Sequence, residues 1–229
     1  MSEWWTYRLG SFLLFSPRTY HRLFELYNQA LWPSQLLAVA IGAAIAALLL
    51  THLAQRDRIV AGLLAIAWLW VAWAFLYERY TQINWIAPWI AAAFALQALL
   101  LVAFGIGGGL RLEAAGGVRG SMAAALFALV VVGYPLLAPL SGRAWTTAEV
   151  FGLAPDPTAL GTLAVLALAR GRSRGWLSAI PLAACALGAL TQRAMREPEQ
   201  FVIVSVVLLG LLIGFRRSSP TARSEPRRL

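Results

Sequence analysis

The sequence predicts an all-α protein: a polytopic bundle of about seven transmembrane helices, preceded by an amphipathic helix at the membrane interface. Hydrophobic residues make up 60% of the 229 residues and charged residues 13%, against roughly 45–50% and 25% in a soluble domain. The apolar stretches are separated by short connectors that carry arginine. A soluble chain of this length has too little interior to bury so much apolar surface, so we expect lipid to surround the bundle.

Residues 1–33 are expected to lie in the interface, because no apolar run among them is long enough to cross ~30 Å of hydrocarbon. Ser16 and Pro17 suit the cap and first position of a helix that Pro33 ends. Apolar side chains recur at helical spacing (Tyr20, Leu23, Phe24, Tyr27, Leu31), and polar ones fill the other positions (Arg18, His21, Arg22, Glu25, Asn28, Gln29). This pattern predicts an amphipathic helix in the headgroup layer.

The bundle is expected to occupy residues 34–215, with the first four spans at 34–53, 59–77, 86–106 and 121–140. In the first span, Ala38, Gly42 and Ala46 form a small-residue face that a neighbouring helix can approach closely. In the fourth, Tyr134 followed by Pro135 predicts a kink.

The fifth segment is ambiguous. Its apolar run, 159–169, would extend only ~16 Å as a helix, so it crosses only if the helix begins near Glu149. The alternative is a re-entrant segment and six spans. The last two spans are expected at 176–191 and 201–215, and residues 216–229 form a basic tail that we expect to be disordered.

Arginines set the expected orientation. With seven spans, twelve arginines fall on one side, including those of the tail, and seven on the other. The positive-inside rule then predicts a cytoplasmic C-terminus and an extracytoplasmic N-terminal helix, whereas six spans would place both termini in the cytoplasm.

Composition excludes several functional classes. The chain has no lysine for a retinal Schiff base, and the single cysteine, Cys185, excludes an internal disulfide or a dithiol redox pair. The net charge of +9 comes from arginines beside apolar stretches, which indicates anionic lipid headgroups and not nucleic acid. We expect no metal and no cofactor, and no enzyme, because the sequence contains no GxSxG or HExxH motif.

Polar residues inside hydrocarbon are the first candidates for a site: Gln97 and Tyr134, with Thr162 and Ser205. Gln97 is expected either to hydrogen-bond to another helix, which we favour, or to line a solute path.

Charged residues near span ends form a second group. Glu78, Arg79 and Asp156, together with Glu149 and Arg143, would face the same side in the seven-span arrangement and line a vestibule. A purely structural role is favoured for two of them: Asp156 as a helix cap before Pro157, and Glu78 as a solvated helix end.

The third group is aromatic. Trp70, Trp73 and Tyr77 continue to Tyr80 at helical offsets and predict a continuous stripe. Such a stripe could cage a cation through its ring faces, but an interfacial aromatic belt is the favoured interpretation.

Several short segments of the sequence resemble those of an uncharacterised bacterial family of polytopic inner-membrane proteins. They are Glu3–Tyr7, Phe15–Tyr20, Leu23–Asn28, Ile83–Trp85, Phe151–Gly152 and Pro155–Thr158. The resemblance implies a multi-pass membrane protein and supplies no activity, ligand or site residue.

The sequence therefore leads to two functional hypotheses. The first is a non-enzymatic inner-membrane permease or channel-like carrier for a small solute. Because no buried carboxylate is expected, its mechanism would be facilitative or would use an energy source supplied by a partner. The second is an accessory subunit of a larger membrane complex. The expected partners are membrane lipids and, in the second case, other membrane subunits; a homo-oligomer is compatible with both.

Overall fold

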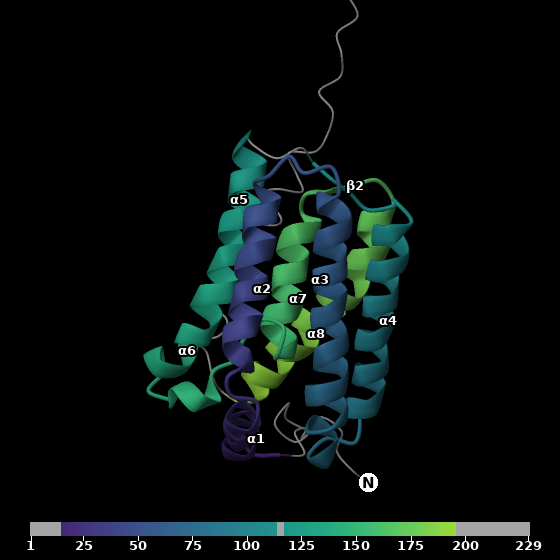
Figure 1. Cartoon of the computed structure of the whole chain (residues 1–229). Coiled ribbons are helices and arrows are strands. Elements are labelled where there is room, and N and C mark those ends of the chain that lie inside the picture. The colour runs from purple at the N-terminus through teal and green to yellow at the C-terminus, as the bar shows by residue number, and fades with distance from the viewer. Residues whose placement is uncertain (1–14, 114–116, 196–229) are drawn as a thin grey trace, which may run out of the picture.

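The computed structural model describes residues 15–113 and 117–195 and shows an all-helical bundle. The helices are α1 (Pro17–Ala30), α2 (Ser34–Leu49), α3 (Arg56–Trp70), α4 (Ala87–Ile106), α5 (Gly117–Ala128), α6 (Tyr134–Leu140), α7 (Pro155–Leu166) and α8 (Ser173–Met195). Two short strands, β1 (Arg111–Leu112) and β2 (Ala169–Arg170), pair antiparallel between connectors at one end of the bundle (Figure 1).

Four helical stretches of the described residues are long and apolar enough to cross a membrane: Arg56–Gln82, Ala87–Ile106, Val118–Leu140 and Ser173–Met195. The count rises to five if α1 and α2, which meet at 91°, form one broken span. The second, third, fourth and sixth expected spans are thus present as long apolar helices. The expected span at 201–215, the tail and the first 14 residues lie outside the described residues.

Two of these stretches contain π-helical turns. Val71–Tyr77 continues α3, and Leu129–Gly133 joins α5 to α6, where the sequence predicted a kink at Tyr134. In the first, the amide of Glu78 bonds to the carbonyl of Trp73, five residues back. A π-turn holds more residues than an α-turn, so it rotates every later side chain around the helix axis.

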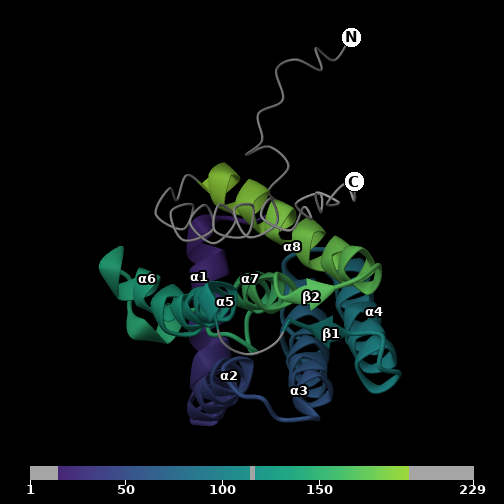
Figure 2. The same cartoon turned by 90° about the horizontal axis from the view of Figure 1, so that it is seen from above.

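The fifth segment differs from expectation. α7 has only 12 residues, and all of them from Asp156 to Leu166 are buried. Residues 147–154, which lead into α7, are buried as well although most of them are not helical. Viewed from above, α7 lies at the centre of the bundle with the other helices around it (Figure 2). Irregular backbone is tolerated at this buried position because other parts of the protein surround it.

The connectors of α2–α3, α4–α5 and α7–α8 meet at the same end of the bundle. Arg111 pairs with Arg170 across β1 and β2. The buried Arg56 donates through Nη2 to the carbonyls of Leu112 and Glu113, at 3.2 and 2.7 Å, and Asp57 accepts from the amide of Leu112 at 3.1 Å. The re-entrant alternative would put Arg111 and Arg170 at opposite ends, so it does not fit this pairing.

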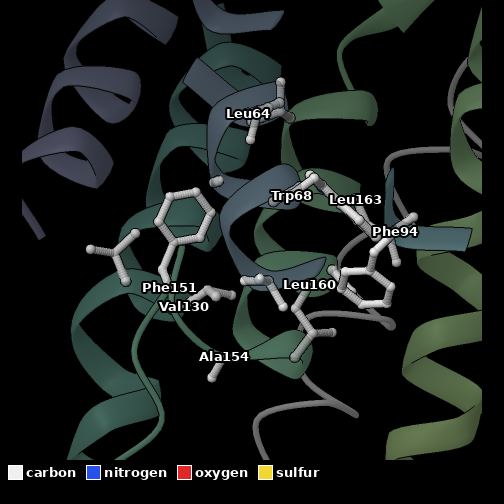
Figure 3. Close-up of a cluster of buried hydrophobic side chains, with 14 of the residues drawn as sticks. Leu64, Trp68, Phe94, Val130, Phe151, Ala154, Leu160 and Leu163 are labelled. Atoms are coloured by element: carbon white, nitrogen blue, oxygen red, sulfur yellow. The ribbon is translucent and has the colours of Figure 1, made fainter. Parts of the chain in front are cut away.

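The core surrounds α7. Leu160 and Leu163 of α7 lie against Leu64 and Trp68 of α3, with Phe94, Val130, Phe151 and Ala154 alongside (Figure 3). The small-residue face of α2 is packed as expected, and within the chain: Ala38 and Gly42 are buried, and a Cβ on Gly42 would lie 2.8 Å from Cγ1 of Val131.

α1 forms as expected, with the Ser16 hydroxyl accepting from the amide of Thr19 at 3.2 Å. Its aromatic face, however, contacts protein: the ring centroids of Phe24 and Phe75 are 4.6 Å apart. Asn28, which the sequence placed on the polar face, is buried and donates to the carbonyls of Thr146 and Ala148, both at 2.8 Å. α1 therefore closes one end of the bundle.

Candidate functional site at the start of α7

Asp156 occupies the first turn of α7 and is only 9% exposed. The cap interpretation of Asp156 was wrong: Ala154 holds the cap position, and no side chain bonds there. Pro155 and Pro157 flank the aspartate and fit the first turn because amides there have no partner within the helix. The local sequence thus starts the helix, and the carboxyl is left to contact other elements.

Three residues from two other helices surround this carboxyl. The hydroxyl of Tyr134, at the start of α6, donates to Oδ2 of Asp156 at 3.4 Å, which is a long hydrogen bond. Gly188 of α8 faces the carboxyl so closely that a Cβ there would lie 2.3 Å from Oδ1. The amide of Gln192, one turn later, is buried beside the carboxyl without a hydrogen bond of normal geometry. Asp156 is therefore buried with weak polar compensation, an expensive arrangement in a protein interior.

A pocket of about 40 Å³ opens beside Asp156. Four aromatic residues, Tyr20, Phe75, Tyr80 and Phe94, form part of its wall, and Thr191 of α8 adds a hydroxyl. This volume holds one or two water molecules or a small ion. A carboxylate among ring faces favours a small cation, because both groups attract positive charge.

The aromatic walls belong to one cluster. The rings of Phe75 and Tyr80 stack with centroids 5.9 Å apart, and Tyr20 meets Tyr80 edge to face at 6.3 Å. Phe15 stacks on Tyr20 at 5.7 Å. α1 thus contributes a wall of the pocket, a role that the sequence analysis did not assign to it.

Glu149 is a second buried acid, 4% exposed, in the segment before α7. The expectation that the bundle lacks a buried carboxylate was therefore wrong.

The predicted aromatic stripe is interrupted. Trp70, Trp73 and Tyr77 are 42%, 61% and 52% exposed on the outer surface, whereas Tyr80 is buried at 8%. Tyr80 lies beyond the π-turn of Val71–Tyr77, in the 3-10 turn of Tyr80–Gln82, so the α-helical offset does not extend to it. The rings of Trp73 and Tyr77 stack, with centroids 5.7 Å apart, but neither residue lines the Asp156 pocket.

The predicted vestibule residues are not brought together with Asp156 either. Glu78 is exposed and Arg79 is half-buried, and neither lines the pocket. Among the candidate residues, a side-chain hydrogen bond joins Tyr134 and Asp156.

Gln97 makes the cross-helix bond that we favoured. It is fully buried on α4, and its Nε2 donates to the carbonyl of Leu177 on α8 at 3.0 Å. It does not line the Asp156 pocket. Its place is between helices, where it holds α4 to α8.

Thr162 is part of a buried hydrogen-bond network along α7. It accepts from Nε1 of Trp68 at 2.7 Å and donates to the carbonyl of Thr158 at 2.8 Å. Thr158 in turn accepts from the amide of Gly152 at 2.8 Å and donates to the carbonyl of Ala154 at 2.7 Å. This network fixes the irregular segment against the helix. Ser205, the fourth polar candidate, lies outside the described residues.

The residues that sequence reasoning missed are Gly188 and Gln192 on α8 and Tyr20 and Tyr80 on the pocket wall. Gly188 and Gln192 are one helical turn apart, but a lone glycine and a lone glutamine carry no specific signal. Within residues 15–113 and 117–195, no group of three His, Cys, Asp or Glu side chains is arranged to hold a metal ion.

Neither the curated proteins nor the solved structures include a match to this chain. A family model does match, and it covers residues 18–225, which is nearly the whole chain. The resemblance to an uncharacterised family is thereby confirmed: the chain belongs to DUF6064, a family of unknown function.

Proposed function

We propose that this protein is a multi-pass inner-membrane carrier for a small cationic solute, with Asp156 as the residue that receives it. The observation that carries the proposal is a buried carboxyl that borders a pocket with aromatic walls. An acid at such depth is costly unless it has a role or a strong partner, and its hydrogen bond from Tyr134 is long.

The dimensions of the site limit the solute. A pocket of about 40 Å³ accommodates an ammonium-sized or methylammonium-sized ion, and not a metabolite. Asp156 would supply the countercharge, and Thr191 a hydrogen-bonding hydroxyl, while Tyr134 donates to Asp156 from outside the pocket. The sequence alone led us to expect no charged group inside the bundle. In this proposal, Asp156 neutralises the charge of the cationic solute there.

A flux measurement tests the proposal. The full chain is reconstituted in vesicles, and uptake of radiolabelled methylammonium is compared with that of empty vesicles. Replacing Asp156 by asparagine removes the countercharge and should slow uptake about tenfold or more. Glu78→Gln removes an exposed acid outside the pocket and should leave uptake unchanged. Wild-type flux equal to that of empty vesicles, or equal flux in Asp156→Asn, would refute the proposal.

The charge distribution supports an orientation for this carrier. The described connectors at the β1–β2 end carry seven arginines and two acids, whereas the α1 end carries five arginines and four acids. By the positive-inside rule, the β1–β2 end faces the cytoplasm. With a seventh span, the C-terminus is cytoplasmic too. A C-terminal fluorescent-protein fusion should then be bright and a C-terminal alkaline-phosphatase fusion silent, and the reverse pattern would contradict the orientation.

The accessory-subunit hypothesis keeps one observation in its favour. A shallow groove of about 120 Å³ between α2 and α3 is almost wholly apolar, and the exposed side chains of Leu37, Ile66 and Trp70 border it. A helix of a partner subunit could pack there. This role would be supported if other subunits co-purify stoichiometrically with the wild-type chain and are lost from Ile66→Trp. Ile106→Trp, on the exposed face of α4, is the control and should keep them. A homogeneous particle of this chain alone would contradict it.

A further inference from the structure

A second pocket lies at the opposite end of α8 from Asp156. It has a volume of about 580 Å³ and is lined by residues of the β2–α8 connector and the first turns of α8, among them Arg172, Arg174, Trp176 and Ser178. Nothing in the proposed carrier function uses this pocket.

The geometry of α8 creates the space. Arg174, Ser178 and Leu182 recur every four residues and therefore share one face of the helix. Gly175 lines the same pocket, and a Cβ on it would meet no atom within 4 Å. Because Gly175 has no side chain, there is open space beside the first turn of α8.

A buried hydroxyl marks the inner wall. Ser178 is 5% exposed, and its Oγ has no hydrogen-bond partner among the described residues. Buried hydroxyls in proteins are nearly always bonded, so a ligand oxygen that reached Ser178 would satisfy an otherwise costly group.

The outer wall is positively charged. Arg172 is exposed and Arg174 is partly buried. Glu113, an acid of the α4–α5 connector at this end, accepts from Arg119 at 2.9 Å and lies 3.6 Å from Arg170. Among the described residues at this end of the bundle, arginines outnumber acids, so positive charge is in excess around the pocket. Guanidinium groups bind phosphate oxygens through charge-assisted hydrogen bonds.

The pocket also continues into an apolar surface. Leu182, one turn beyond Ser178, is 49% exposed, and Trp176 is 68% exposed. Tryptophan at this level is typical of the headgroup boundary, with acyl chains below it. We propose that this pocket binds a phosphate group, carried by an anionic phospholipid whose acyl chains lie along α8. Free phosphate shares the same chemistry, and the experiment separates the two sources.

The test measures the thermal unfolding temperature of the full chain in a neutral detergent. Phosphatidylglycerol, phosphatidylcholine and inorganic phosphate are added separately. A ligand well above its dissociation constant should raise the unfolding temperature by about 5 °C. A rise with phosphatidylglycerol alone identifies a phospholipid site, and a full rise with inorganic phosphate identifies free phosphate. No rise with either overturns the proposal.

Three variants connect the effect to this pocket. Gly175→Leu fills it without changing charge and should abolish the rise. Arg172→Gln alters an exposed residue, so it should fold normally and reduce the rise by at least half. Arg58→Gln removes an exposed arginine at the same end of the bundle but outside the pocket, and should keep the full rise. Equal losses in Arg172→Gln and Arg58→Gln would show that only surface charge matters and would overturn the site.

Discussion

At the scale of single residues, the lack of a side chain on Gly188 leaves the space that the buried Asp156 carboxyl occupies. Asp156 rests against Gly188, where any Cβ would fall 2.3 Å from its Oδ1. The carboxyl therefore depends on the glycine for its space, and on Tyr134 for its hydrogen bond.

Replacing Gly188 by alanine should destabilise the protein by about 1–3 kcal/mol, because the new methyl group overlaps the Asp156 carboxyl. The measurement is the unfolding temperature in detergent. Gly62→Ala is the matched control: it lies within α3, where a Cβ meets nothing within 4 Å, and the higher helix propensity of alanine should leave stability equal or raised by up to ~1 kcal/mol.

A double variant separates this contact from a general effect on α8. Shortening Asp156 to alanine in the Gly188→Ala protein removes the overlap, so the double variant should be more stable than the sum of the two single changes predicts. Strict additivity would mean that the glycine and the acid do not share the space that the structure gives them.

At the scale of elements, α1 is a lid on the bundle and not a helix lying free in the headgroup layer. Its rings pack on Phe75 and Tyr80, and Asn28 bonds to two carbonyls of the segment before α7. This helix therefore couples one wall of the Asp156 pocket to the segment that leads into the buried helix.

Asn28→Ala should release that connection. The loss of two hydrogen bonds leaves the Thr146 and Ala148 carbonyls without this donor and should destabilise the contact by roughly 1–3 kcal/mol. Amide hydrogen exchange should become faster in α1 and in residues 145–148, and stay unchanged in α4. Gln29→Ala, at the adjacent exposed position, should not change exchange in either segment; an equal effect would contradict the docking role of Asn28.

Local signals predicted the elements well. Hydropathy located the second, third, fourth and sixth spans, and Ser16 followed by Pro17 marked the start of α1, because these signals act over a few neighbouring residues. The burial of Asn28, Arg56 and Asp156 was not predictable in this way. Each depends on a partner more than 20 residues away, and the same side chains suit a solvated position equally well.

The prediction of a continuous aromatic stripe from Trp70 to Tyr80 was wrong for a different reason. Helical offsets assume a constant number of residues per turn, whereas the chain is π-helical over Val71–Tyr77 and forms a 3-10 turn at Tyr80–Gln82, so the α-helical offset does not carry through to Tyr80. The candidate site was accordingly predicted in part: Tyr134 and Asp156 were named, but the sequence analysis separated them into different groups and missed Gly188, which brings α8 against them.

At the scale of the whole molecule, the pairing of β1 with β2 joins two connectors that are far apart in the sequence. Arg111 and Arg170 are cross-strand partners, so the chain must cross from one end of the bundle to the other between α6 and β2. The buried segment at 147–154 and α7 together make that crossing.

A cross-link tests this arrangement. In a Cys185→Ser background, the pair Arg111→Cys and Arg170→Cys should form a disulfide under mild oxidation, because antiparallel partners have Cα atoms about 4.5–5.5 Å apart. Mobility on a gel before and after reduction is the measurement. The pair Arg79→Cys and Arg170→Cys should remain reduced, since these residues lie at opposite ends of the bundle; the opposite result would refute the topology.

The buried position of α7 also has a consequence for biogenesis. A helix of 12 residues with no lipid-facing side is a poor substrate for the insertion machinery, which admits segments one at a time according to their own hydropathy. Its stable placement requires α8, its main packing partner, which is synthesised later. The centre of this protein is therefore expected to assemble last, after the outer helices are already in the bilayer.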